Sequence, residues 1–159
     1  MSCVKLRQLN VSHNFISGQV PHSISQLQSL TLLYANHNQI SGSIPDCLPR
    51  LLKLEFLNLS HNDLEGSLPG NIGQLELLQV CMLHGNRLVG PVPESISRLT
   101  KLKDFRLFAS CKCETMSMPA AFKKTSFERV FCWGTSVGLN NVTWVEEDKR
   151  RKKKHHHNR

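Results

Sequence analysis

The chain has 159 residues, of which 40% are apolar and 20% are charged, and its formal net charge is +8 at pH 7. This length and composition are typical of about one folded domain and argue against a wholly disordered chain. Residues 149–159 hold seven of the twenty Lys and Arg and no acidic residue, which leaves 13 basic and 12 acidic residues in 1–148. The body is therefore nearly neutral, which does not indicate a nucleic-acid-binding domain.

Membrane and export signals are not evident in this sequence. No apolar run approaches the ~18 residues that a transmembrane helix needs. Residues 1–6 contain no long apolar stretch of the kind that a secretion signal requires. We therefore expect an intracellular location by default, and an extracellular one if the chain is a fragment of a secreted or receptor-like protein.

A 24-residue repeat organises the first two thirds of the chain. Asn, Gly and Pro recur at this spacing in four successive copies, and apolar residues keep the same frame. So many positions in one register indicate a stacked repeat, with one coil per copy. The repeated positions are Asn14, Asn38, Asn62 and Asn86, then Gly18, Gly42, Gly66 and Gly90, then Pro21, Pro45, Pro69 and Pro93.

Within each coil the residue types predict a strand, a turn, a bend and a helical turn, in that order. Alternating apolar residues before the Asn, such as Leu57 and Leu59, indicate a half-buried strand. The Asn amide can satisfy backbone groups at the turn, and the Gly four residues later permits a positive φ. The Pro suits the start of a short helix. The three-residue spacing of Ile24, Leu27 and Leu30 favours a 3₁₀ segment.

A single coil cannot bury its own apolar side, so the coils must stack to form a continuous core. A fifth coil keeps Leu102 and Phe105 in frame, but Ser110 stands where the Asn belongs. We therefore assign residues 1–110 to an array of four coils and a degenerate fifth. Cys3 and Cys81 occupy leucine positions and are expected to be small apolar core residues.

The segment 57–69, Leu-Asn-Leu-Ser-His-Asn-Asp-Leu-Glu-Gly-Ser-Leu-Pro, resembles the plant-type leucine-rich repeat, whose core pattern is L-x-L-x-x-N-x-L-x-G-x-I-P. The resemblance covers residues 3–110. It implies an α/β solenoid with a parallel sheet on the concave face and short 3₁₀ or irregular segments on the convex face. In receptor-like kinases, receptor-like proteins and polygalacturonase inhibitors such arrays are recognition surfaces. The resemblance thus implies a protein or peptide recognition module, in receptor-like signalling or defence.

Residues 111–148 do not continue the repeat. They contain one leucine, against 22 in residues 1–110, and five of the ten aromatic residues. We interpret them as a non-repeat C-terminal flank or cap, because the last coil of a solenoid needs a cover; a small separate binding module is the alternative. Residues 120–132 predict a short helix with Phe127 and Phe131 on one face.

The basic tail suggests a second kind of partner. Residues 149–159 are of low complexity and repel one another, so we expect them to be disordered. The basic run 149–154 could contact a polyanion or an anionic membrane. A protein that binds polyanions through this tail is one alternative function. A structural or degenerate fragment of a longer receptor-like protein, without binding of its own, is the other.

Metal and cofactor chemistry has little support in the sequence. His13, His37 and His61 share one repeat position and could form a metal-binding ladder. The favoured interpretation is that this is an ordinary position at the end of the strand, which histidine commonly occupies in the repeat. His84 lies one position earlier, which breaks this column. Cys111-x-Cys113 with Cys132 is a weak zinc signal because the spacing is short and a fourth ligand is missing. We expect no metal and no cofactor, and free thiols by default.

Catalytic motifs are also missing, since the sequence contains no G-x-S-x-G, H-E-x-x-H, phosphate-loop or kinase signature. We therefore expect that the protein is not an enzyme and has no small-molecule substrate. Glycosylation sequons begin at Asn10, Asn58 and Asn141, and the first two arise from the repeat pattern itself.

The outward positions of the predicted strands form the candidate binding surface. On a soluble solenoid these positions should be mostly polar, yet Leu32, Phe56 and Val80 make an apolar stripe. Contiguous apolar surface marks interaction sites; the alternative is that the flank covers it. The predicted partner-binding residues are Leu32, Tyr34, Phe56, Asn58, Val80, Met82, His84 and Arg106.

Overall fold

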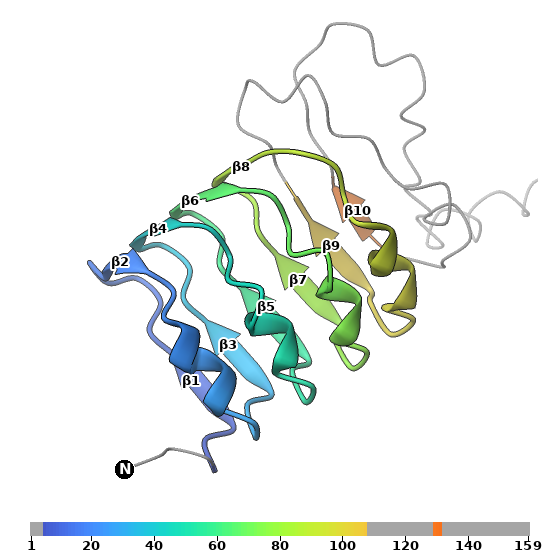
Figure 1. The fold of residues 1–159 in the computed structure, drawn as a ribbon. Helices are drawn as coiled ribbons and strands as arrows, with labels where there is room; N and C mark the ends of the chain where they lie inside the picture. The colour runs from blue at the N-terminus through green and yellow to red at the C-terminus, as the bar shows by residue number, and fades with distance from the viewer. Residues whose placement is uncertain (1–4, 108–128, 132–159) are drawn as a thin grey trace, which may run out of the picture.

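The structure is a computed structural model that describes residues 5–107 and 129–131. In the first range the chain winds into coils that stack side by side (Figure 1). Each of the first four coils runs through a strand, a second short strand and a 3₁₀ helix. The array confirms the solenoid that the repeat predicts. No helix in the described residues is long and apolar enough to cross a membrane.

Six parallel strands form one wall of the solenoid, and we call this wall the concave sheet. Five of them come from successive coils, so neighbours in the sheet lie 24 residues apart in the sequence, as in the register Leu33↔Leu57↔Cys81. The strands, in their order across the sheet, are β1 (Gln8–Asn10), β3 (Leu32–Tyr34), β5 (Phe56–Asn58), β7 (Val80–Met82), β9 (Asp104–Arg106) and β10 (Arg129–Phe131).

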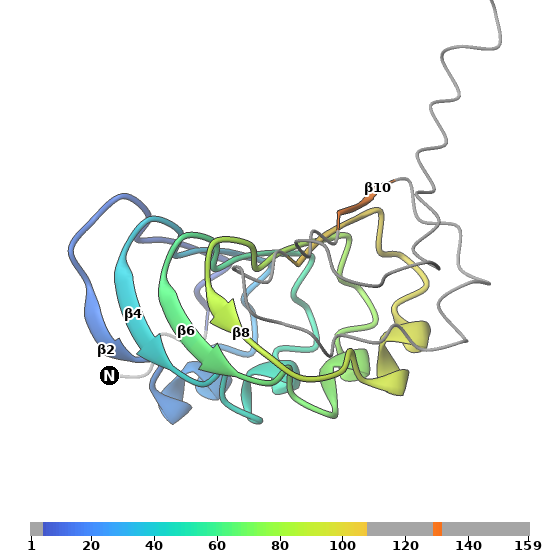
Figure 2. The ribbon, with the colours of Figure 1, turned by 90° about the horizontal axis from the view of Figure 1, so that it is seen from above.

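A second parallel sheet, which the sequence did not predict, follows the asparagine turn in each coil. Figure 2 shows its strands side by side along one flank of the stack. They contain or adjoin the repeated glycines, whose φ values of 73° to 84° confirm the predicted bend at Gly18, Gly42, Gly66 and Gly90. The strands are β2 (Ser17–Gln19), β4 (Gln39–Gly42), β6 (Asp63–Gly66) and β8 (Arg87–Leu88).

Short 3₁₀ helices close each coil, as the three-residue spacing predicts. Each repeated proline precedes its helix, and its carbonyl accepts a hydrogen bond of 2.9 to 3.0 Å from the amide three residues later, as in Ile72 N to Pro69 O. Pro21 and Pro93 stand directly before their helices, and Pro45 and Pro69 stand three residues before theirs. The helices are η1 (His22–Gln26), η2 (Leu48–Arg50), η3 (Ile72–Gln74) and η4 (Glu94–Arg98).

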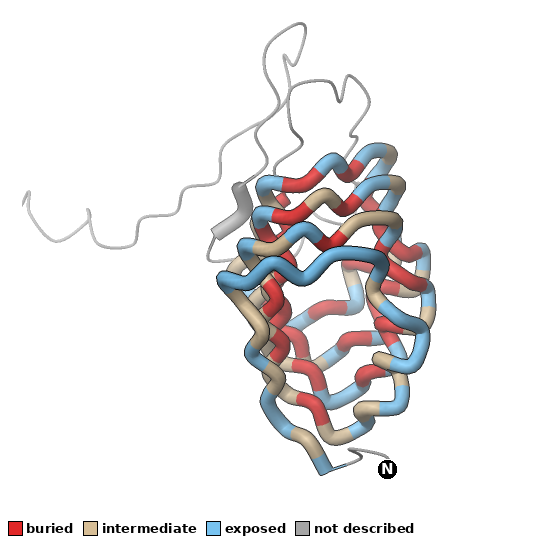
Figure 3. Tube along the Cα trace, turned by 90° about the vertical axis from the view of Figure 1, so that its left-hand side faces the viewer, coloured by how far each residue is buried: buried red, intermediate tan, exposed pale blue. Residues whose placement is uncertain are grey.

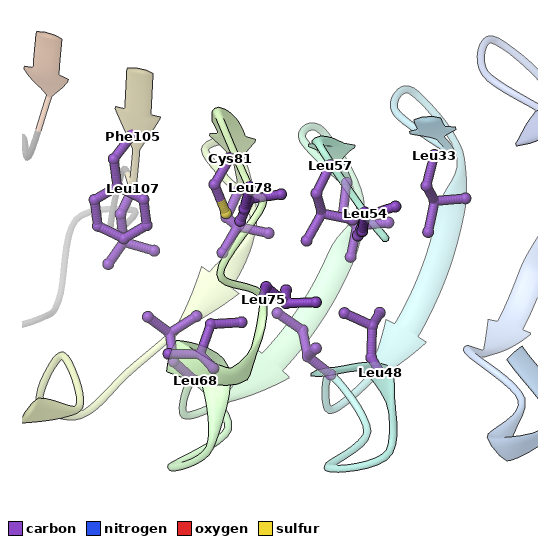
Figure 4. Close-up of a cluster of buried hydrophobic side chains, with 14 of the residues drawn as sticks. Leu33, Leu48, Leu54, Leu57, Leu68, Leu75, Leu78, Cys81, Phe105 and Leu107 are labelled. Carbon is purple, nitrogen blue, oxygen red and sulfur yellow. The ribbon is translucent and has the colours of Figure 1, made fainter. Parts of the chain in front are cut away.

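The core runs along the inside of the stack. Buried segments recur at the same places in successive coils (Figure 3), and the strand and helix leucines point toward each other (Figure 4). Leu57, Leu75 and Phe105 are fully buried. Cys81 is buried in a leucine position, as predicted, and burial, with a smaller contribution from Asp104, raises the pKa of its thiol to about 12. It therefore stays protonated and packs as an apolar side chain.

The end of the array corrects the prediction for residues 120–132. Residues 129–131 form strand β10, not a helix, and pair in parallel with β9 in the register Val130↔Phe105. A strand is favoured here because the last coil leaves the backbone groups of β9 on an open edge. The other residues assigned to the flank or cap 111–148, and the tail 149–159, lie outside the described residues, as do Cys3, Cys111, Cys113 and Cys132.

Candidate binding surface on the concave sheet

The outer face of the concave sheet is built by strand alternation. In β3, β5, β7 and β9 the middle residue is buried in the core, and the residues on either side are half-buried. Since successive side chains of a strand point to opposite faces, the flanking residues lie on the solvent side. The structure brings seven of the eight candidate binding residues together on these strands; His84 follows at the end of β7.

The first row across this face is the apolar stripe. Leu32 pairs in register with Phe56, and Phe56 pairs with Val80. Parallel strands lie about 4.8 Å apart, so these side chains are close neighbours. The ring of Phe56 also meets Tyr34 diagonally, with a centroid distance of 4.6 Å. The stripe is half-buried rather than fully exposed.

The second row contains Tyr34, Asn58 and Met82 in register. The Oδ1 atom of Asn58 accepts hydrogen bonds from the amide and hydroxyl of Ser60, at 3.1 and 2.6 Å. Ser60 is itself buried. Asn58 is therefore held in place, and its Oδ1 is engaged within the chain.

An ion pair joins the two rows at β9. The Arg106 guanidinium donates two hydrogen bonds, from Nε at 3.0 Å and from Nη2 at 2.8 Å, to the two carboxylate oxygens of Asp104. This hydrogen-bonded partner raises the pKa of Arg106, so the guanidinium stays charged. Sequence reasoning selected Arg106 for binding but missed this pairing. The i, i+2 spacing on one strand face was the signal for it.

His84 extends the histidine column rather than breaking it. Its ring meets His61 edge-on, with a centroid distance of 5.0 Å and an interplanar angle of 84°. The prediction of a break was wrong because it rested on His84 standing one position earlier than the other histidines. Gly85 stands at the column position itself and has no ring, so His84 is the residue of the fourth coil whose ring meets His61. In the described part of the chain, no group of three or more His, Cys, Asp or Glu is arranged to hold a metal ion.

The repeated asparagines join neighbouring coils below this surface. Asn62 Nδ2 donates to Ala35 O of the preceding coil at 2.9 Å, and Asn62 Oδ1 accepts from the Ile40 amide at 3.0 Å. Asn38 and Asn86 repeat this pattern with their own preceding coils. These bonds fix the strand-end turns relative to one another, and so hold the concave sheet in register.

Comparison with known proteins agrees with this geometry. A family model for the leucine-rich repeat matches residues 4–64. No curated protein matches the sequence at a significant level. Repeat spacing, parallel register and asparagine turns together define a leucine-rich-repeat solenoid.

Solved structures with the same fold come from plant receptors. One is the ectodomain of the Arabidopsis thaliana receptor kinase GASSHO1/SCHENGEN3 in complex with CASPARIAN STRIP INTEGRITY FACTOR 2, at 31% identity and a TM-score of 0.66. Another is the Arabidopsis receptor kinase HAESA with the peptide hormone IDA and the co-receptor SERK1, at 31% identity and a TM-score of 0.65. A third is the ectodomain of the Arabidopsis thaliana receptor kinase SOBIR1, at 30% identity and a TM-score of 0.62.

These matches cover 73%, 73% and 72% of this chain. The chain in turn spans only 13%, 18% and 60% of the three receptor chains. The protein is a plant-type leucine-rich-repeat protein, and it corresponds to a few coils of the longer receptor arrays.

Proposed function

We propose that this chain is a non-enzymatic module that recognises a protein or a peptide through the outer face of the concave sheet. The observation that carries this proposal is the apolar stripe of Leu32, Phe56 and Val80 on the solvent side of three adjacent strands. The strand exteriors of a solenoid that face only water are expected to be polar, whereas contiguous apolar side chains mark interaction sites. The proposal explains why they occur together.

The composition of the stripe fits an anchor site for a side chain of the partner. Phe56 lies at the centre, between Leu32 and Val80, and packs against the ring of Tyr34. Aromatic residues at the centre of an interface contribute most of the binding energy when a partner excludes water from them. The stripe spans about 10 Å across three strands, which suits an extended segment that crosses the sheet.

The solved relatives support a partner of this class. The GASSHO1/SCHENGEN3 ectodomain was solved with CASPARIAN STRIP INTEGRITY FACTOR 2, and HAESA was solved with a peptide hormone and a co-receptor. These ligands were found with the two receptors and not with this chain. For this chain they favour a protein or peptide over a small-molecule substrate.

The test is to select binders from a random peptide display library against the wild-type chain, and then to measure their affinity for two variants. Phe56→Ser removes the central ring, and Phe15→Ser removes a ring that is 87% exposed and lies before β2. We expect Phe56→Ser to weaken binding about thirtyfold or more, equivalent to about 2 kcal/mol. Phe15→Ser should leave the affinity unchanged.

The opposite result would place the binding site elsewhere on the array. If Phe15→Ser weakened binding and Phe56→Ser did not, the partner would contact the region of β2 instead of the concave sheet. Circular dichroism of both variants shows whether each remains folded, because a binding loss that came from unfolding would not count for the stripe.

A further inference from the structure

Four histidine rings form a continuous column beside the concave sheet. The rings of His13 and His37 stack with centroids 4.4 Å apart and an interplanar angle of 16°. The rings of His37 and His61 stack at 4.3 Å and 13°, and His84 closes the column edge-on against His61. His37 is thus covered on both faces by other imidazoles, although its edge remains open to solvent.

The backbone at these positions adopts an unusual conformation. His13, His37 and His61 have φ values of 53° to 55°, in the left-handed region that residues other than Gly rarely adopt, although Asn, Asp and His do so more often than most. In the fourth coil Gly85 takes this conformation, with φ 69°. A Cβ atom at Gly85 would lie 2.7 Å from His61 Nδ1, so the ring of His61 fills the space that a side chain there would need. The rings and the strand-end turns therefore form one packed unit.

The charges around the column oppose protonation. Loss of water around the ring, followed by the neighbouring His61 and His13, lowers the pKa of His37. For His84, burial is again the main cause of a lowered pKa, and His61, Arg106 and His37 act in the same direction. Among the residues that the structure describes, Asp104 favours the charged form of His84, and Arg106 already pairs with this carboxylate.

We propose that the column of His13, His37, His61 and His84 is a pH-sensitive element, in which protonation separates the stacked rings and loosens the strand-end turns of the first four coils. Two neutral imidazoles can stack at 4.3 to 4.4 Å, but two imidazolium ions at this spacing repel each other. The inference concerns the stability of the array and holds whether or not the concave face binds a peptide.

The direction of the pH effect follows from linkage. A lowered pKa in the folded state means that the folded chain binds fewer protons than the unfolded chain near the ordinary histidine value of about 6.5. Stability is therefore fully present above about pH 6.5 and falls as the solution becomes more acidic.

The experiment compares thermal melts of the full chain at about pH 7.5 and about pH 5. His37→Asn removes the central ring with a residue that tolerates a positive φ. His22→Asn is the matched control, because His22 is an exposed residue of η1 outside the column. The histidines of the tail are present in every variant, so they cancel in the comparison.

We expect the melting temperature of the wild type and of His22→Asn to fall on acidification by about 4 °C more than that of His37→Asn, a shift typical of one interaction in a domain of this size. If His37→Asn lost as much as the wild type, the column would not be the sensitive element. If His37→Asn does not fold, His37→Gly replaces it, since glycine already serves at position 85.

An NMR titration of the wild type tests the same proposal without any substitution. The proposal requires the His37 resonance to titrate below the ordinary histidine pKa of about 6.5, because desolvation and the neighbouring His61 and His13 lower its pKa. If His37 titrated at or above that value, the proposal would be wrong.

Discussion

The first and third coils share one sequence frame but differ in burial. In the first coil no residue of η1 is buried, and Asn14 is exposed. In the third coil Leu57 is fully buried, and Asn62 is 7% exposed. In Figure 3 the first coil is exposed along most of its length, whereas inner coils alternate with buried segments. The repeat therefore sets the path of each coil, while neighbours on both sides set its burial.

Hydrogen bonding shows the same contrast. The Nδ2 atom of Asn62 reaches back to Ala35 O in the preceding coil, and its Oδ1 accepts from the Ile40 amide there. The Nδ2 atom of Asn14 donates to Val11 O at 3.1 Å and to Ser12 O at 2.9 Å, both within its own coil. The same residue type therefore couples two coils in one place and braces a single turn in the other.

The largest expected difference in stability between the two coils comes from truncating a core leucine. Leu57→Ala should destabilise the array by about 2–5 kcal/mol, through lost burial and the cavity left behind. Leu9→Ala, at the same repeat position in the first coil, should cost clearly less because Leu9 is only partly buried. Denaturant melts of the two variants measure this. Equal losses would mean that the first coil is as well covered as the third.

Replacing the asparagines should also destabilise the third coil more than the first, but by less than replacing the leucines does. Asn62→Ala leaves the carbonyl of Ala35 and the amide of Ile40 without their side-chain partner, at a cost of about 1–3 kcal/mol. Asn14→Ala should cost less, because its turn is exposed and water can replace the amide. Thermal melts compare the two. If neither variant shifted the melting temperature, these side chains would not hold the coils together.

The solenoid, the inward alternation of the strands, the positive-φ glycines and the 3₁₀ helices could all be predicted from sequence. Each depends on residues that repeat in a fixed frame, so a column such as Leu33, Leu57 and Cys81 is visible without a structure. The outward placement of Phe56 follows from the same alternation.

The second sheet and strand β10 could not be predicted this way. Strands such as Ser17–Gln19 are short and polar and show no apolar alternation; they form because stacking brings equivalent backbone segments together. Strand β10 comes from outside the repeat, and its pairing with β9 depends on a distant edge. Contacts between different repeat positions, such as His84 with His61, also cannot be predicted by comparing equivalent positions of the repeat.

The smallest expected effect concerns the basic tail. If stacked coils alone set stability, deleting residues 149–159 should leave the melting curve nearly unchanged. The deletion should also abolish retention on heparin or on anionic vesicles, because the remaining residues hold 13 basic and 12 acidic side chains. Chromatography of the full chain and the deletion variant at several salt concentrations measures this. Retention that survives the deletion would reveal a basic face on the body.

Binding of a partner to the outer face of the concave sheet can be observed by NMR of the methyl groups on that face. A peptide selected against the wild-type chain is titrated in, while the methyl resonances of Leu32, Val80 and Met82 are compared with those of Leu52 and Val89. The latter two are exposed apolar residues away from the concave strands. We expect the methyl resonances of Leu32, Val80 and Met82 to shift and to saturate with binding. Those of Leu52 and Val89 should change little. Saturating shifts confined to Leu52 or Val89 would contradict it.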